Sequence, residues 1–210
     1  MSTITDILHN EAIKRYEEDG SNQWPHIQRV LQQAQAIADY RQRRLSNAEL
    51  AAVYFHDIDK KNAGNIDHGV YASRLAKKIL KKHLSERDLN TAVNAIYWHN
   101  MDLPSKTKTA DLLRSADANK PDLGWFLRKS YNKMTSKGLT HEEAIDNALR
   151  MAKKGVPVAD QLKNRPILYQ EAFSSDIERT RKAIKALKRE QVWNYIQKYE
   201  KDHPNESKYA

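Results

Sequence analysis

Apolar residues recur through most of the chain at intervals of three and four positions, a spacing that places them on one face of an α-helix. After Pro25 this apolar stripe consists of Ile27, Val30, Leu31, Ala34, Ile37 and Ala38. No segment shows the sustained period-two alternation that is typical of a β-strand. Only six glycines and six prolines interrupt the chain. The sequence therefore predicts an all-α protein.

Local start and stop signals divide this pattern into separate helices. The first helix is expected over residues 3–18, and Pro25 opens the second. Ser46 and Glu49 have the spacing of a capping box, which predicts a third helix ending near His56. The remaining expected elements are a loop over residues 60–69 and helices through 75–80, from Ser85 to the YWHNMDLP segment, over 107–119, and in the C-terminal third.

The length and composition limit the class of protein. A chain of 210 residues can form one sizeable core, and we expect a helical bundle over residues 1–122 with a C-terminal helical extension, 123–210, packed on the same domain. No run of about 18 apolar residues exists, so no membrane partner is expected. The N-terminus does not resemble a signal peptide, and a cytoplasmic location is the expectation. Cysteine is absent, so any metal must be held by His, Asp or Glu.

The formal net charge is +9, and part of it lies in the segment ERTRKAIKALKRE, residues 178–190. One interpretation is an amphipathic helix with a solvated basic face. The other is a surface that attracts anionic ligands such as nucleotides or nucleic acid. Net charge alone does not separate the two.

Several candidate metal ligands occupy the apolar faces of different predicted helices. His26 precedes Val30 by four positions, and His68 lies on the face that continues through Ala72, Leu75 and Ile79. His99 and Asp117 each follow an apolar residue of their own helix by four positions. A buried carboxylate is costly unless it is paired or bound to a metal. Together with the pair His56-Asp57, this pattern favours a His/Asp metal site over isolated core histidines.

The order of these residues resembles the HD-domain superfamily of metal-dependent phosphohydrolases, whose motif is H…HD…H…H…D on a helical bundle. The resemblance covers residues 24–120 and rests on the segments VYFHDIDK, DHGVYASRLAKKIL and LLRSADANK. It implies an HD-domain helical bundle. The last 90 residues resemble no family that we can name.

The resemblance also implies a ligand set. His26, His56, Asp57 and Asp117 would form a primary metal site. His68 and His99 match the histidines that hold a second metal in binuclear members, whereas in mononuclear members such positions face the substrate phosphate. One or two divalent ions are implied, and Mn²⁺, Fe²⁺, Co²⁺, Ni²⁺, Mg²⁺ and Zn²⁺ all suit nitrogen and oxygen ligands.

The resemblance assigns a phosphate contact to Lys60, so that the implied catalytic residues are Asp57, Lys60, His68 and His99. The family usually has glycine where this chain has Asp59, a carboxylate that either orients Lys60 or a water, or caps the helix end. Further candidates for phosphate contacts are Lys61, Lys106, Lys108 and Arg114. Arg114 precedes Asp117 by one turn, so it equally suits a role as a partner of that carboxylate. The aromatic residues near the ligands, which either stack on a base or pack in the core, are Trp24, Tyr97 and Trp98.

The sequence therefore predicts a metal-dependent phosphohydrolase, of the phosphatase, phosphodiesterase or nucleotidase type, acting on a nucleotide or a related small phosphorylated substrate. Two alternatives stay open. Some six-ligand members of the superfamily bind two irons and carry out O₂-dependent oxidation. A non-catalytic HD protein that binds nucleic acid or a protein partner is the third class.

Overall fold

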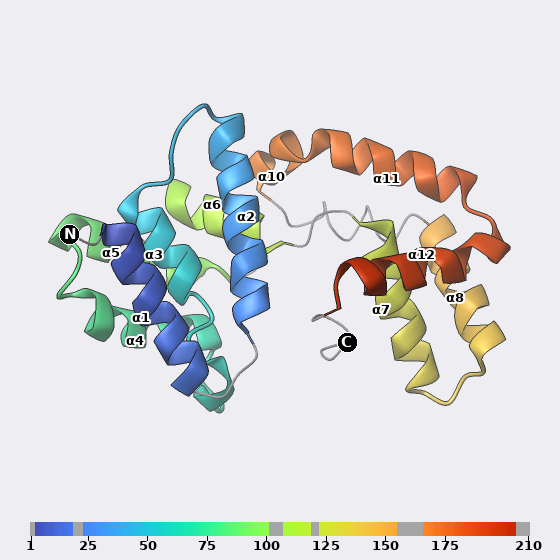
Figure 1. Ribbon diagram of the computed structural model, residues 1–210, viewed down its shortest axis with the longest axis horizontal. Coiled ribbons are helices and arrows are strands. Elements are labelled where there is room, and N and C mark those ends of the chain that lie inside the picture. Colours follow the sequence, from blue (N-terminus) through green and yellow to red (C-terminus); the bar gives the residue numbers. More distant parts are fainter. Residues whose placement is uncertain (1–2, 19–22, 101–106, 119–121, 155–165, 205–210) are drawn as a thin grey trace. The chain divides into compact units, whose positions relative to one another are not determined.

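The computed structural model describes residues 3–18, 23–100, 107–118, 122–154 and 166–204. All regular elements in these ranges are helices, so the prediction of an all-α protein is confirmed. The chain divides into two compact units (Figure 1). Unit 1 comprises residues 1–118 and 166–172, and unit 2 comprises residues 119–165 and 173–210.

Unit 1 is built around one short, deeply buried helix, α3. The elements of this unit are α1 (Ile4–Glu18), α2 (Trp24–Tyr40), α3 (Asn47–Phe55), the 3₁₀ turn η1 (Lys60–Asn62), α4 (His68–Leu80), α5 (Glu86–Trp98), α6 (Lys108–Asp117) and α10 (Ile167–Ala172). Helix α3 contacts α1, α2, α4, α5 and α6. Because α3 is surrounded by other helices, its residues 51–55 are buried whichever side of the helix they occupy. Residues 56–58, which follow α3, are buried as well.

The start of α3 is fixed by the predicted capping box. The Ser46 hydroxyl accepts a hydrogen bond from the Glu49 backbone N–H, and the Glu49 carboxylate accepts one from the Ser46 N–H at 2.8 Å. Arg43 donates two further hydrogen bonds to the same carboxylate, both at 2.7 Å. The Glu49 carboxylate thus accepts three hydrogen bonds at the N-terminal end, while the opposite end of α3 leads into His56 and Asp57.

The other boundaries in unit 1 differ from the sequence pattern by a few residues. The expected loop over residues 60–69 instead contains η1, and α4 begins at His68 with Asp67 as its N-cap. Thr107 is the N-cap of α6, which ends at Asp117, and Asn119 lies outside the described residues.

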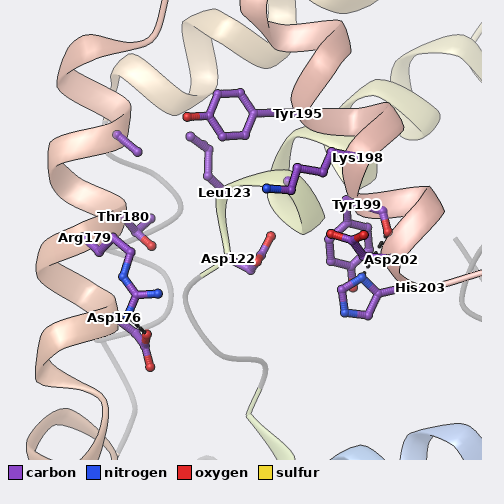
Figure 2. Close-up of a pocket in the computed structure, with 12 residues that line it drawn as sticks. Asp122, Leu123, Asp176, Arg179, Thr180, Tyr195, Lys198, Tyr199, Asp202 and His203 are labelled. Carbon is purple, nitrogen blue, oxygen red and sulfur yellow. Dashed lines mark hydrogen bonds and ion pairs between the residues drawn. The ribbon is translucent and has the colours of Figure 1, made fainter.

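Unit 2 contains α7 (Leu123–Thr135), α8 (His141–Lys153), α11 (Ser174–Ala186) and α12 (Arg189–Asp202). Helix α7 packs against α8, α11 and α12. Gly124 permits the approach of α12, because a Cβ atom there would lie 2.9 Å from the Tyr199 Cβ. A pocket of about 510 Å³ lies between the start of α7 and helices α11 and α12 (Figure 2).

None of the helices in the described ranges combines the length and apolar character that crossing a membrane requires.

Candidate metal centre

Six His and Asp residues from five helices of unit 1 supply ligand atoms to two adjacent groups. His26 lies in the first turn of α2, and His68 is the first residue of α4. The pair His56-Asp57 follows α3 directly, His99 follows α5, and Asp117 ends α6. The first group is His26, His56 and Asp117, and the second group is Asp57, His68 and His99. In each group the ligand atoms lie within 4.8 Å of one another.

The first group brings two imidazoles and one carboxylate together. His26 Nε2 lies 3.1 Å from His56 Nε2 and 3.2 Å from Asp117 Oδ1. His56 Nε2 lies 3.6 Å from the same Asp117 oxygen. The His56 side chain is fully buried, whereas about a third of the Asp117 side chain is exposed. The group is therefore open on the Asp117 side.

The second group has the same composition. His68 Nε2 lies 3.2 Å from His99 Nε2, and Asp57 Oδ1 lies 3.5 Å from the first and 3.7 Å from the second of these nitrogens. The side chains of Asp57 and His99 are 4% and 1% exposed. His68 is only half-buried, so this group also has one accessible ligand.

Asp57 connects the two groups through its two carboxylate oxygens. Its Oδ1 faces His68 and His99, while its Oδ2 lies 3.5 Å from His26 Nε2 and 2.9 Å from Lys60 Nζ. The buried Oδ1 accepts no hydrogen bond within the described residues. A buried carboxylate oxygen without a donor is unfavourable, and a cation between Oδ1 and the two imidazoles would satisfy it. The residues present therefore fit a bound metal.

Two of the histidines are held in the form that binds a metal through Nε2. His56 Nδ1 lies 2.8 Å from the Val53 carbonyl oxygen, and His99 Nδ1 lies 2.6 Å from the Ile96 carbonyl oxygen. Each Nδ1–H donates to a carbonyl three residues earlier, in the last turn of its own helix. The lone pair of Nε2 is left free to act as a ligand.

His26 differs, because its Nδ1 lies 2.8 Å from Arg29 Nη2. A guanidinium can only donate, so Nδ1 accepts here, and neutral His26 then carries its proton on Nε2. A cation held by Nε2 would require the proton on Nδ1 instead, the atom to which Arg29 now donates. His26 is thus the ligand whose surroundings must change most when the site is filled.

The carboxylates of the centre are ionised at neutral pH. Burial raises the pKa of Asp57, but the positive charges of His56 and Lys60 outweigh it, and the pKa lies far below its usual range. Burial also opposes ionisation of Asp117, and the imidazoles of His26 and His56 beside it again hold the pKa well below the usual value. Both side chains are in the form that binds cations.

The pKa values of His56 and His68 are shifted in opposite directions by their surroundings. Burial lowers the pKa of His68, and the nearby charge of Lys60 lowers it further, so this imidazole is neutral and available as a ligand. Burial also disfavours the charged form of His56, but the carboxylates of Asp57 and Asp117 raise its pKa overall. The carboxylates therefore attract positive charge to the place where a metal would lie.

A small polar network orients the second group. Asn100 Nδ2 donates to Asp67 Oδ2 at 2.7 Å and lies 3.3 Å from His68 Nδ1. Gly69 makes room for this amide, because a Cβ at that position would lie 2.6 Å from Asn100 Oδ1 and 3.1 Å from the Ile96 carbonyl oxygen. The glycine after His68 is thus explained by the close approach of the α5 end to the α4 start.

Asp59 adopts a left-handed conformation with φ of 55°. Glycine is the residue that tolerates this left-handed conformation best. The Asp59 carboxylate accepts a hydrogen bond from Tyr71 Oη at 2.8 Å and another from the Asn62 amide. These contacts tie the turn that carries Lys60 to α4.

Lys60 itself donates to Asp57, and its side chain is 41% exposed. Among the other candidates for phosphate contacts, Lys61 and Lys108 are exposed, Arg114 is half-buried, and Lys106 lies outside the described residues.

The neighbouring aromatic residues pack against one another. The Trp24 ring stacks on the Tyr54 ring with centroids 6.2 Å apart, and Tyr97 meets Trp98 edge to face at 5.1 Å. Trp24 is half-buried, and its ring also contacts the rings of His9 and Tyr16.

All six candidate ligands predicted from the sequence lie in the two groups, whereas the residues that surround them were not predicted. These residues are Arg29, Asp67, Asn100 and Tyr71, which are all common types in helices and caps. Only two of them had a detectable signal in the sequence, because Asp67 directly precedes His68 and Asn100 directly follows His99.

No protein-family model, curated protein or solved structure matches the chain. The geometry by itself supports an all-helical protein whose buried His/Asp groups can hold metal ions.

Proposed function

We propose that the chain is a metal-dependent phosphohydrolase of the HD type, cleaving a phosphate ester or anhydride in a nucleotide or a related small substrate. The observation that carries the proposal is Asp57. Its two oxygens face two His-containing groups, and the Lys60 ammonium lies directly beside it. Ligands for one or two cations next to a fixed positive charge suit the cleavage of an anionic substrate.

The ligand set would hold divalent cations through His26, His56 and Asp117 on one side and His68, His99 and Asp57 on the other. Such a cation supplies Lewis acidity and lowers the pKa of bound water towards neutrality. The carbonyl oxygens of Val53 and Ile96 keep two of the imidazoles oriented towards the ligand position.

Lys60 is the proposed phosphate contact. An ammonium group has three N–H donors, and Asp57 accepts one of them, so two remain for the non-bridging oxygens of a phosphate. Because Asp57 fixes the ammonium, little reorganisation is needed when the substrate binds. The exposed Lys61 is positioned one residue further along the same 3₁₀ turn and is a candidate for additional phosphates.

A diiron oxygenase is the second candidate, and the six ligands in two groups are the observation that favours it. The Lys60–Asp57 contact favours the phosphohydrolase, because a fixed cation has a direct use against phosphate oxygens.

The decisive experiment combines metal analysis with a substrate panel. Protein purified without chelator is analysed for bound metal and then tested with Mn²⁺, Co²⁺ and Mg²⁺ on nucleoside mono-, di- and triphosphates, cyclic dinucleotides and an aryl phosphate. Release of phosphate or pyrophosphate is the expected result. Metal-loaded protein that releases neither from any substrate, and consumes O₂ instead, would show the oxygenase alternative to be correct.

The role of Lys60 is tested by Lys60→Gln, with Lys77→Gln on the exposed surface of α4 as a matched control. We expect kcat/KM of Lys60→Gln to fall by about 10²–10³-fold, the range found for loss of one preorganised donor to a developing charge. The metal content should stay unchanged. Equal kcat/KM in both variants would exclude Lys60 as the phosphate contact.

A further inference from the structure

The net charge of the chain is divided very unequally between the two units. Unit 2 contains 19 Lys and Arg against 11 Asp and Glu, which gives +8. Unit 1 contains 17 against 16, which gives +1. Almost all of the +9 therefore belongs to the unit that contributes no residue to the candidate metal centre.

Part of this excess is concentrated at the C-terminal end of α11. Lys153 Nζ donates to the carbonyl oxygens of Ile184 and Lys185 at 3.0 and 2.9 Å, so the end of α8 lies against the end of α11. Six exposed cations come from these two helix ends and the residue before α12, and we call them the α11 basic face: Lys153, Lys154, Arg181, Lys182, Lys185 and Lys188.

These cations are poorly neutralised by neighbouring acids. Arg181 makes a long contact of 3.9 Å with Glu178, and both side chains are at least half exposed. Within the described residues no ion pair involves Lys182 or Lys185. By contrast, Arg189 at the start of α12 is paired with both Glu142 and Asp146 of α8. Arg181, Lys182 and Lys185 thus form a local group of cations that acids neutralise weakly.

The opposite side of α11 has a different character. It lines the pocket of unit 2, where Arg179 pairs with Asp176 at 2.6 Å (Figure 2). Asp122 and Asp202 also line this pocket, and Lys198 of α12 extends into it. A pocket lined by both acids and bases does not favour an extended anion. The cations of the α11 basic face lie on the other side of the helix, where they are exposed to solvent.

We propose that the α11 basic face binds the phosphate backbone of a nucleic-acid strand. Arg181, Lys182 and Lys185 lie within about one turn of α11, where positions three and four apart share a face, and Lys188 follows just beyond the end of this helix. A cluster of exposed cations with few acidic partners is complementary to the closely spaced phosphates of a polyanion.

The distribution of apolar residues favours nucleic acid over an anionic membrane. A helix that lies in a membrane interface inserts large apolar side chains beside its cations. Among the described residues the exposed large apolar side chains are Tyr40, Ile66 and Ile167, and all three belong to unit 1. The α11 basic face offers charge without an apolar anchor. This proposal is independent of the proposed phosphohydrolase activity.

The test uses the full chain and a fluorescein-labelled, 20-nucleotide single-stranded RNA, with binding measured by fluorescence anisotropy between about 50 and 300 mM NaCl. Binding with a slope of log K against log salt of about −3 to −4 is expected if five or so phosphates are neutralised. The variant is Lys182→Gln, Lys185→Gln and Lys188→Gln together. It should bind at least about 10-fold more weakly at 50 mM NaCl, with a slope shallower by about 2.

The matched control replaces Lys77, Lys78 and Lys81 of unit 1 with Gln, which removes the same charge from another exposed helix end. It should bind RNA like the unmodified chain. Equal weakening in both variants would mean that binding follows overall charge, and it would overturn the proposal. So would binding to phosphatidylserine vesicles or to polyglutamate that is as tight as binding to RNA. Circular dichroism checks that all variants stay folded.

Discussion

Units 1 and 2 are both helical, but they use their charged residues in opposite ways. Unit 1 is almost neutral, and it buries His56, Asp57 and His99 beside the central helix α3. Unit 2 carries +8 and keeps most of its cations at the surface. Burying an ionisable group is costly unless a partner compensates it, whereas exposing one costs little. The comparison indicates that unit 1 gathers buried ionisable residues at one place, whereas the described cations of unit 2 are mostly exposed to solvent.

The strongest test of this contrast removes the carboxylate shared by the two groups. We expect Asp57→Ala to lower phosphohydrolase kcat/KM by at least about 100-fold and to reduce bound metal, because Asp57 is the residue whose oxygens face both groups. RNA binding by unit 2 should be unchanged. Metal analysis and anisotropy measure the two effects separately. Full activity with wild-type metal content would contradict the role of Asp57, and parallel loss of RNA binding would contradict the separation of the units.

A second, smaller effect is expected from the network that orients His68. Asn100→Ala removes the amide that lies beside His68 Nδ1 and that donates to Asp67. Loss of such an outer partner typically weakens metal affinity 10–100-fold. Among the described residues, Asn100 makes no contact with the first group. We therefore expect this variant to weaken metal binding at the second group only.

Isothermal titration with Mn²⁺ measures this effect, and Asn94→Ala on the exposed side of α5 is the control. Two equally weakened sites, or no weakening at all, would show that Asn100 does not orient His68.

The sequence predicted the ligands of the centre better than it predicted their supports, and the reason is physical. A candidate ligand such as His99 can be recognised in the sequence in two ways, by its residue type and by its position on the apolar face of a helix. Asn100 acts through one amide across the α4–α5 contact, and its effect depends on the missing Cβ of Gly69. Such tertiary contacts have no periodicity along the chain.

Helix boundaries show the same limit. The capping box of α3 is local and was predicted correctly, because Ser46 and Glu49 interact within one turn. The 3₁₀ turn at Lys60–Asn62 and the left-handed Asp59 depend on Tyr71, twelve residues away. Nor does the sequence indicate that α10 packs with α2 and α6 in unit 1.

The smallest predicted effect compares two capping boxes, one in each unit. Glu49 of α3 and Glu143 of α8 occupy the same position in the same motif, but Glu49 is buried and paired with Arg43, whereas Glu143 is exposed. Burial raises the pKa of Glu49, yet the hydrogen bonds from Arg43 and Ser46 outweigh it, so the pKa in the folded protein lies below the usual glutamate value. The ionised carboxylate therefore stabilises the fold at pH values above the usual glutamate pKa. This contribution is lost as the pH falls through the lowered pKa of the folded protein.

We expect Glu49→Gln to reduce the free energy of unfolding by about 1–3 kcal/mol at pH 7, the range for hydrogen bonds to a charged group, and Glu143→Gln to have a clearly smaller effect. Urea unfolding at several pH values between about 7 and 3 measures both. The difference between Glu49→Gln and the unmodified chain should shrink towards pH 3, because protonated Glu49 then resembles the amide. A difference that stays constant with pH would mean that packing, and not charge, accounts for the effect. Equal losses in the two variants would show that burial of the acid in unit 1 brings no added stability, and the contrast between the units would then be confined to the metal centre.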